Sequence, residues 1–296
     1  MSGIFWLASY PKSGNTWMRI FLTNYLQNGD EPADINNLDG GPIASAREVF
    51  DELVGVEASA LTLAEIEALR PQVYTRFARD LEKDEFLKVH DAYTLNADGL
   101  PLFPPEATQG AIYILRNPLA VAPSLANHIN NSLEQAIEIL NDTFSPETKH
   151  RSVGLGPQLP QNWMGWSGHV NSWAKAPGQR VLLVRYEDMK HNPFAVFRAV
   201  VRFSGLEEDE ARIRKAIEFS SFETVRKQEQ EHGFRERLRS PAFFRKGESG
   251  GWRSELSPEQ ITCIVTAHAD TMRRYGYLNA AGEPAEALEL EEFTYA

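Results

Sequence analysis

The sequence predicts an α/β fold, built as a single domain with a mostly parallel central sheet flanked by helices. Two observations support this prediction. The 296-residue chain is 42% hydrophobic, which is enough to bury a full core in one domain. Short apolar runs alternate with segments of helical spacing, the order typical of a parallel sheet wound by helices. These runs lie near Ile4, Phe86, Ile112 and Val181.

Composition limits the organisation and the partners of the chain. No repeat or linker divides it, so we expect one domain over residues 1–280 and an acidic, loosely held tail over residues 281–296. The net charge of -11 argues against a nucleic-acid partner or a polyanionic acceptor. The sequence has neither a signal-peptide pattern nor an apolar run of about 20 residues, so we expect a cytoplasmic protein without a membrane span.

Local signals predict where helices begin and end. The capping-box pattern Thr62–Glu65 predicts a helix that stops at Pro71. Ser257–Gln260 predicts a last helix running toward Tyr275. The single cysteine, Cys263, falls in that helix, which excludes a disulfide within the chain and favours a buried position.

The segment after the first apolar run is the most informative. It is Ser9-Tyr10-Pro11-Lys12-Ser13-Gly14-Asn15-Thr16-Trp17, and apolar residues then recur at helical spacing until Asn28. The N-terminus of such a helix attracts an anion, and Lys12 adds a mobile positive charge. An ordinary nucleotide P-loop places its lysine after the second glycine, whereas Lys12 precedes Gly14. We therefore predict a P-loop-like turn that holds a phosphate or sulfate.

Two further segments carry anion-binding residues. The apolar run that starts at Ala111 ends in Arg116-Asn117-Pro118, which predicts a strand with an arginine at its carboxyl end and a helix starting at the proline. Arginine suits a phosphate there because its planar fork holds two oxygens at once. Near the C-terminus, Arg245-Lys246-Gly247 opens a glycine-rich segment that reaches Arg253, and its glycines allow a loop to close on an anion.

In this order, the three segments resemble those of the sulfotransferases that use 3′-phosphoadenosine 5′-phosphosulfate (PAPS), whose loop is usually Tyr-Pro-Lys-Ser-Gly-Thr-Thr-Trp. Asn15 departs from that loop, and Gly251 replaces the aspartate usual in the lid. The resemblance implies that Arg116, Ser124 and residues 245–247 bind the 3′-phosphate. The donor-binding residues that it implies are Lys12, Ser13, Gly14, Asn15, Thr16, Trp17, Arg116, Ser124, Tyr186, Ser220, Phe222, Arg245, Lys246 and Gly247.

The catalytic candidates lie in Lys88-Val89-His90-Asp91, where the family usually shows Lys-Thr-His. The resemblance implies His90 as the general base, with Lys12 and Lys88 stabilising the transferring and leaving groups. Histidine suits this role because its unperturbed pKa, about 6.5, lies near working pH. Asp91 is an alternative base, although an unperturbed pKa of about 3.9 matches the task less well.

The implied function is transfer of a sulfuryl group from PAPS to a hydroxyl, in preference to an amine, of a small-molecule, lipid or glycan acceptor. The spent donor is adenosine 3′,5′-bisphosphate, and the histidines show no metal-ligand spacing, so we expect no metal. A non-catalytic or P-loop nucleotide-binding protein is the alternative. The predicted strands end in His90, Arg116 and Tyr186, not in the aspartate that an NTPase needs for Mg²⁺. An oligomer is possible but not indicated.

The acceptor site is the least defined part of the sequence. The stretch 127–173 carries clustered Asn, Gly, Pro and Trp residues, and we expect it to be irregular. It is either a substrate-facing insertion, with Trp163, Trp166 and Trp173 as hydrophobic walls, or a structural loop with anchoring tryptophans.

Overall fold

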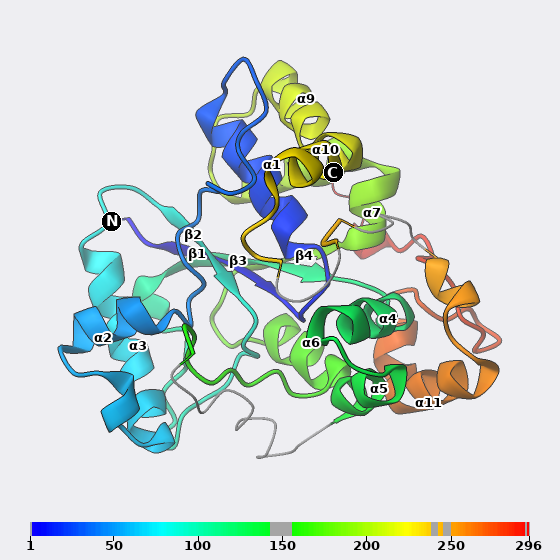
Figure 1. Ribbon diagram of the computed structural model, residues 1–296, viewed down its shortest axis with the longest axis horizontal. Helices are drawn as coiled ribbons and strands as arrows, with labels where there is room; N and C mark the ends of the chain where they lie inside the picture. Colours follow the sequence, from blue (N-terminus) through cyan, green and yellow to red (C-terminus); the bar gives the residue numbers. More distant parts are fainter. Residues whose placement is uncertain (1, 143–155, 238–241, 245–249, 294, 296) are drawn as a thin grey trace. The chain divides into compact units, whose positions relative to one another are not determined.

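The computed structural model describes residues 2–142, 156–237, 242–244, 250–293 and 295 (Figure 1). The contacts of the chain divide it into two compact units. The first unit comprises Met1–Tyr10, Gly40–Tyr113 and Thr143–Leu182. The second unit comprises Pro11–Asp39, Ile114–Asp142 and Leu183–Ala296.

Four strands form one parallel sheet in the order β2-β1-β3-β4. They are β1 (Ile4–Ser9), β2 (Glu85–Val89), β3 (Thr108–Leu115) and β4 (Val181–Arg185). The register of β1 and β2 runs from Ile4 opposite Glu85 to Ala8 opposite Val89. Every residue of β1 is buried, as expected for a strand inside a parallel sheet. The predicted strands and the α/β class are confirmed.

Three helices belong to the first unit: α2 (Arg47–Val54), α3 (Leu63–Arg79) and α6 (Trp166–Ala174), with the 3-10 turns η1 (Ala58–Ala60) and η2 (Pro105–Ala107). Aromatic rings form the core of this unit. The ring of Trp6 lies 5.2 Å from Tyr74 and 4.8 Å from Phe103, and Phe103 lies 4.9 Å from Trp173. Trp166 and Trp173 are fully buried. They are core residues, so the expectation that they wall an acceptor pocket is wrong.

Helix α3 corrects another sequence prediction. Its capping box at Thr62 and Glu65 forms as expected, but the helix continues through Pro71 to Arg79. A proline inside a helix removes one backbone hydrogen bond. Pro71 itself and its neighbours Arg70, Val73 and Tyr74 are buried, and burial of this face offsets the lost bond.

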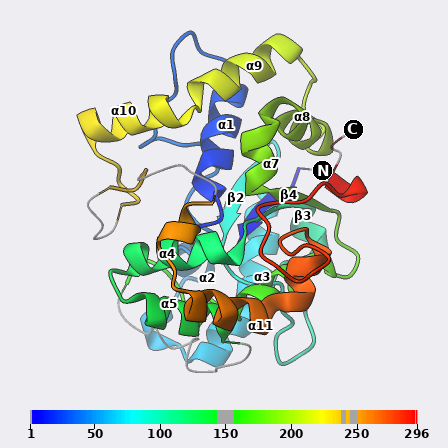
Figure 2. The same ribbon diagram turned by 90° about the vertical axis from the view of Figure 1, so that its right-hand side faces the viewer.

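The second unit is mostly helical. Its helices are α1 (Asn15–Gln27), α4 (Pro118–Ile129), α5 (Leu133–Asn141), α7 (Tyr186–His191), α8 (Pro193–Phe203), α9 (Glu210–Phe219), α10 (Phe222–His232) and α11 (Pro258–Arg274), with 3-10 turns η4 (Gly251–Ser254) and η5 (Glu291–Phe293). Helix α1 packs on α9, and α4, α5 and α11 lie side by side in both views (Figures 1 and 2). The ring of Phe21 stacks on Phe197 at 3.9 Å.

The structure tests several predictions about individual helices and about Cys263. Helix α1 ends before Asn28, which has φ 48°, and α11 begins after the Ser257 capping box, as predicted. Helices α5 and α6 lie inside the stretch expected to be irregular, so that expectation holds only in part. Cys263 is exposed, not buried, because it lies on the outer face of α11.

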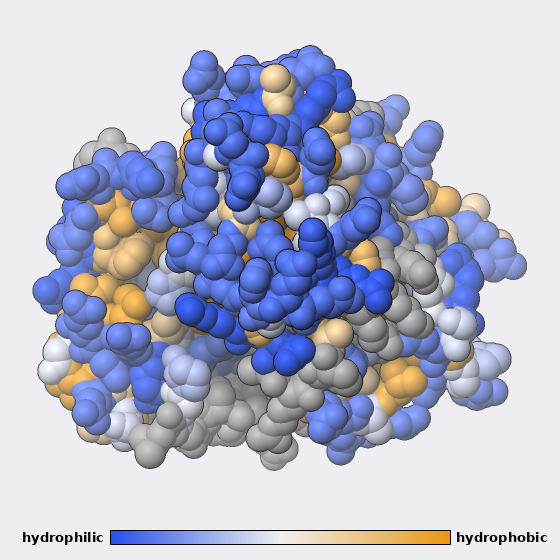
Figure 3. Space-filling model, turned by 45° about the horizontal axis from the view of Figure 1, so that its top comes forward, coloured by the Kyte–Doolittle hydropathy of each residue, from blue (hydrophilic) through white to orange (hydrophobic). Residues whose placement is uncertain are grey.

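The surface around α9 and α10 is mainly hydrophilic (Figure 3). Of the residues of α10, only Val225 and Glu229 are buried. Among the residues that the structure describes, no helix is both long and apolar enough to cross a membrane.

The acidic C-terminal segment is held firmly, which corrects the expectation of a loose tail. The backbone of Ala285 donates to the carbonyl of Tyr277 at 2.9 Å, and Leu288 donates to Gly276 at 2.8 Å. The Tyr295 hydroxyl accepts from the Arg185 amide at 3.1 Å. The net charge of a segment does not determine which backbone hydrogen bonds it forms. The prediction was wrong because it rested on composition alone. The boundary between a domain over 1–280 and a tail over 281–296 stays a prediction.

Phe293 tests this correction. Its side chain is 6% exposed, lies 6.2 Å from the ring of Tyr275 and faces the Arg185 guanidinium at 4.3 Å. We expect Phe293→Ala to lower the free energy of unfolding by about 3 kcal/mol in urea denaturation, because a buried aromatic ring is lost. Leu288→Ala, at a position that is 40% exposed in the same segment, is the control and changes it much less. An unchanged value for Phe293→Ala contradicts the correction.

Candidate active site

The predicted anion loop joins β1 to α1, and two of its residues have left-handed backbone. Lys12 has φ 70° and Gly14, the N-cap of α1, has φ 104°. Gly14 is required for a second reason, because a Cβ there would lie 2.6 Å from Cδ2 of Tyr186. The loop therefore turns tightly into α1 with the ring of Tyr186 against its backbone.

Two buried polar atoms in this loop have no hydrogen-bond partner among the described residues. Neither Oγ of Ser13 nor Nε1 of Trp17 forms a hydrogen bond with any of the described residues, and both atoms are buried. Such groups cost free energy unless something satisfies them. A phosphorylated nucleotide offers oxygen acceptors for both, so the donor set of this loop fits such a ligand.

Arg116 is tied to the same loop. It follows β3 directly, and its Nη1 donates to the carbonyl oxygen of Lys12 at 2.9 Å. Its guanidinium also lies 4.4 Å from the centre of the Tyr186 ring, a cation–π contact. Ser124, the other predicted 3′-phosphate residue, is half-buried in the second turn of α4, the helix that begins two residues after Arg116.

Glu187 supports the turn that carries Arg116. Its carboxylate accepts a hydrogen bond from the backbone amide of Asn117 at 3.1 Å and another from the Tyr277 hydroxyl at 2.9 Å. Burial raises the pKa of Glu187, and the bond from Asn117 and the charge of Arg116 oppose this shift. The sequence analysis missed this role, although a glutamate directly after the predicted Tyr186 was the available signal.

The family resemblance implies adenine contacts for Trp17 in α1, Tyr186 in α7, Ser220 directly after α9 and Phe222 in α10. The Trp17 ring meets Tyr186 and Phe197 edge-on, each at 5.8 Å. Ser220 follows α9, is fully buried, and donates its hydroxyl to the carbonyl of Ala216 at 2.7 Å. That hydroxyl can therefore act toward a ligand only as an acceptor.

The last of these residues, Phe222, begins α10 and is half-buried. It follows Ser221, the N-cap of that helix, whose hydroxyl accepts from the Thr224 amide at 3.3 Å. The local sequence thus fixes where Phe222 enters the helix.

The segment before the predicted lid lies over Lys12. The Nζ atom of Lys12 is 4.1 Å from the centre of the Phe243 ring. Glu229 on α10 holds this segment, since its two carboxylate oxygens accept from the amides of Phe243 at 2.7 Å and Phe244 at 2.9 Å. No sequence signal pointed to Glu229. Arg245, Lys246 and Gly247 lie outside the described residues.

The predicted catalytic segment belongs to the first unit. His90 follows β2, and its Nδ1 lies 2.9 Å from the carbonyl oxygen and 3.3 Å from the hydroxyl of Ser9. A hydroxyl can donate or accept but a carbonyl can only accept, so in the neutral ring Nδ1 carries the hydrogen and Nε2 carries the lone pair. This is the tautomer that a general base at Nε2 needs. Lys88, two residues earlier, is half-buried near the end of β2.

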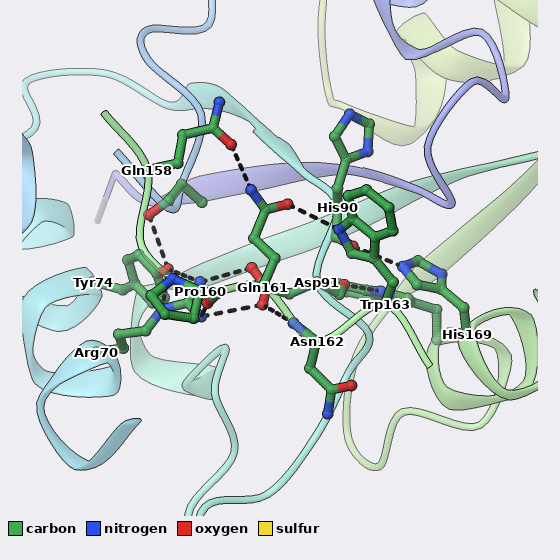
Figure 4. A network of polar contacts seen from close by, with 12 residues as sticks. Arg70, Tyr74, His90, Asp91, Gln158, Pro160, Gln161, Asn162, Trp163 and His169 are labelled. Atoms are coloured by element: carbon green, nitrogen blue, oxygen red, sulfur yellow. Dashed lines mark hydrogen bonds and ion pairs between the residues drawn. The ribbon is translucent and has the colours of Figure 1, made fainter. Parts of the chain in front are cut away.

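Asp91, the alternative base, is fully engaged in an ion pair. It is 1% exposed, and the Arg70 guanidinium holds its two oxygens at 3.1 and 2.7 Å (Figure 4). The amide of Asn162 donates to the same carboxylate at 2.9 Å. Loss of either partner would leave a buried charge unpaired, so this arrangement favours a structural role for Asp91.

Trp163 is the one tryptophan of the predicted acceptor walls that remains half-buried. Its Nε1 donates to the side chain of Gln161 at 3.2 Å, and its ring meets Tyr10 edge-on at 6.4 Å (Figure 4). Within the described ranges, no group of three or more His, Cys, Asp or Glu side chains is placed to hold a metal ion. The expectation that no metal is used stays a prediction.

Curated proteins that are similar to this chain over most of its length are sulfotransferases. Cytosolic sulfotransferase 16 of Arabidopsis thaliana is 27% identical over 88% of this chain and 73% of its own length. Luciferin sulfotransferase of Photinus pyralis is 25% identical over 86% of this chain and 68% of its own length.

Solved structures share the fold. A mouse sulfotransferase, SULT7A1, complexed with PAP has a TM-score of 0.58 at 18% identity, over 95% of this chain and 87% of its own. Retinol dehydratase in complex with androsterone and PAP has a TM-score of 0.60 at 18% identity, over 91% of this chain and 80% of its own. The family model described as the sulfotransferase domain matches residues 3–276. The chain therefore belongs to the sulfotransferase family.

Proposed function

We propose that this protein transfers the sulfuryl group of PAPS to a hydroxyl, in preference to an amine, of a small-molecule, lipid or glycan acceptor in the cytoplasm. One observation carries the proposal. Arg116, assigned to the 3′-phosphate, donates to the carbonyl of Lys12, assigned to the sulfuryl group. The arginine assigned to one end of the donor thus holds the backbone of the loop whose lysine is assigned to the other end. Family membership and the PAP named in both structural neighbours support the same donor.

The remaining donor contacts are proposed from the family resemblance. Ser13, Gly14, Asn15 and Thr16 would surround the 5′-phosphosulfate at the start of α1. Trp17, Tyr186, Ser220 and Phe222 would form the adenine site, with the buried hydroxyl of Ser220 as an acceptor. Ser124 and residues 245–247 would complete the 3′-phosphate site.

In the proposed reaction, a bond forms between the acceptor oxygen and sulfur while the bond from sulfur to the bridging phosphate oxygen breaks. PAPS supplies the activated sulfuryl group and takes the electron pair on its phosphate. Nε2 of His90 takes the acceptor proton, in keeping with its tautomer. Lys12, assisted by Lys88, stabilises the negative charge that shifts to the leaving oxygen. Positioning and electrostatics supply most of the rate enhancement.

The first prediction concerns the donor. We expect adenosine 3′,5′-bisphosphate to bind at least ten times more tightly than AMP in a calorimetric titration, because AMP lacks the 3′-phosphate assigned to Arg116. A tenfold ratio needs about 1.4 kcal/mol, less than one charge-assisted hydrogen bond can contribute. Equal affinity would remove the 3′-phosphate assignment. Binding that depends on Mg²⁺ would favour the P-loop nucleotide-binding alternative.

The second prediction separates charge from shape at Lys12. Lys12→Ala should lower kcat about 10²-fold or more, because a transition-state charge contact is lost. Lys12→Arg should restore little, since a planar guanidinium does not replace a compact ammonium. Radiolabelled PAPS incubated with a metabolite extract identifies an acceptor, which then serves in the assay. Lys227→Ala, at an exposed lysine of α10, is the control. Wild-type turnover in Lys12→Ala would show that Lys12 has no catalytic role.

The third prediction concerns the base. His90→Ala should lower kcat about 10²- to 10⁴-fold, and the pH profile of kcat should lose its rising limb. Binding of the bisphosphate should stay nearly unchanged, because the base acts on the acceptor. His232→Ala, at an exposed histidine, is the control. If His90→Ala keeps wild-type turnover, the base is a different group even though the donor assignment stands.

A further inference from the structure

His90 lies just beyond the end of β2, so its carbonyl is no longer part of the sheet. A buried histidine on α6 supplies a partner: Nε2 of His169 lies 3.1 Å from that carbonyl oxygen (Figure 4). His169 is fully buried. The other ring nitrogen, Nδ1, lies 2.9 Å from the hydroxyl of Tyr113 on β3.

These contacts fix the state of His169. The carbonyl of His90 can only accept, so Nε2 of His169 must carry a hydrogen, and Nδ1 then accepts from the Tyr113 hydroxyl. Burial lowers the pKa of His169 to about 4, although the bond to His90 and the charge of Asp91 oppose the shift. His169 is therefore neutral near pH 7, with a single hydrogen that is directed at His90.

Asp91, the residue after His90, is also held by a side chain of α6. Nε1 of Trp173, one helical turn after His169, donates to the carbonyl of Asp91 at 3.0 Å, while Arg70 holds the Asp91 carboxylate. The amide of Ala92 donates to the carbonyl of Asn162 at 2.7 Å. With Asp91 and Ala92 fixed in this way, the bond from His169 holds the orientation of the peptide that leaves His90.

We propose that His169 is a positioning residue for the general base: it fixes the His90 carbonyl, and with it the ring that donates from Nδ1 to Ser9 and presents Nε2 to the acceptor. Tyr113 acts through His169 by selecting its tautomer. This inference rests on the proposed function of His90. A misplacement of the base by about 1 Å is enough to lower turnover about 10²-fold.

Two substitutions of His169 separate positioning from simple packing. The amide nitrogen of glutamine reaches about as far as Nε2 of histidine, whereas that of asparagine reaches only about as far as Nδ1. His169→Gln can therefore still donate to His90, and we expect it to keep kcat within a few fold. His169→Asn should lower kcat about 10- to 100-fold. In both variants, the affinity for adenosine 3′,5′-bisphosphate should stay unchanged.

The control is His268→Asn. His268 is also a buried histidine with a pKa lowered to about 4 by burial, but its Nε2 bonds to Asn141 in the second unit. We expect this variant to lose a similar amount of free energy of unfolding and to leave kcat unchanged. NMR of the unliganded protein, labelled with nitrogen isotope at histidine, reads the His90 tautomer directly. We expect a single Nδ1–H tautomer in the wild type and in His169→Gln, and a mixture in His169→Asn.

Equal kcat in the two His169 variants, or an unchanged His90 tautomer in His169→Asn, overturns the proposal. If neither variant folds, Tyr113→Phe decides, because it removes only the hydroxyl that selects the His169 tautomer. A several-fold loss of kcat in Tyr113→Phe supports the proposal, and wild-type kcat with an unchanged His90 spectrum overturns it. Full turnover in His90→Ala would show separately that the proposed function of His90 is wrong. The NMR result would then still test whether His169 fixes the geometry of His90.

Discussion

The ring of Tyr186 is the constraint on which the donor side of the protein depends. One edge of the ring meets the backbone of Gly14 so closely that no side chain fits between them. Its face carries the Arg116 guanidinium, and Trp17 packs against it edge-on. Arg116 in turn holds the carbonyl of Lys12. This single ring thus sets the distance between the anion loop and the arginine, which lie about a hundred residues apart in the chain.

The catalytic segment is organised by buried polar groups instead. Asp91 and Arg70 form an ion pair that is almost entirely removed from water. Such a pair contributes little net stability relative to apolar residues, but loss of either partner is costly. Its effect here is geometric, because the paired Asp91 cannot move and His90 directly precedes it. His169 and Trp173 add contacts to the backbone of the same segment, so the position of the proposed base is fixed by several interactions.

Local chemistry made part of this predictable. The loop Lys12–Trp17, the start of α4 at Pro118 and the capping boxes of α3 and α11 depend on residues that lie within a few positions of one another. Three of the wrong predictions share a different origin. Pro71 inside α3, the buried Trp166 and the ordered C-terminal segment all depend on burial against distant residues. That burial outweighs a weak local preference.

Short runs of residues were enough to predict the α/β class, the anion-binding loop and Arg116, because strand periodicity, helix N-termini and charge are local features, whereas His90 was predicted only from the family resemblance. Only the tertiary structure decided which tautomer His90 adopts, that Asp91 is paired, and that Glu187, Glu229 and His169 support the site. Those roles depend on hydrogen bonds between residues far apart in the chain. Such bonds form only where folding brings a buried donor against a buried acceptor.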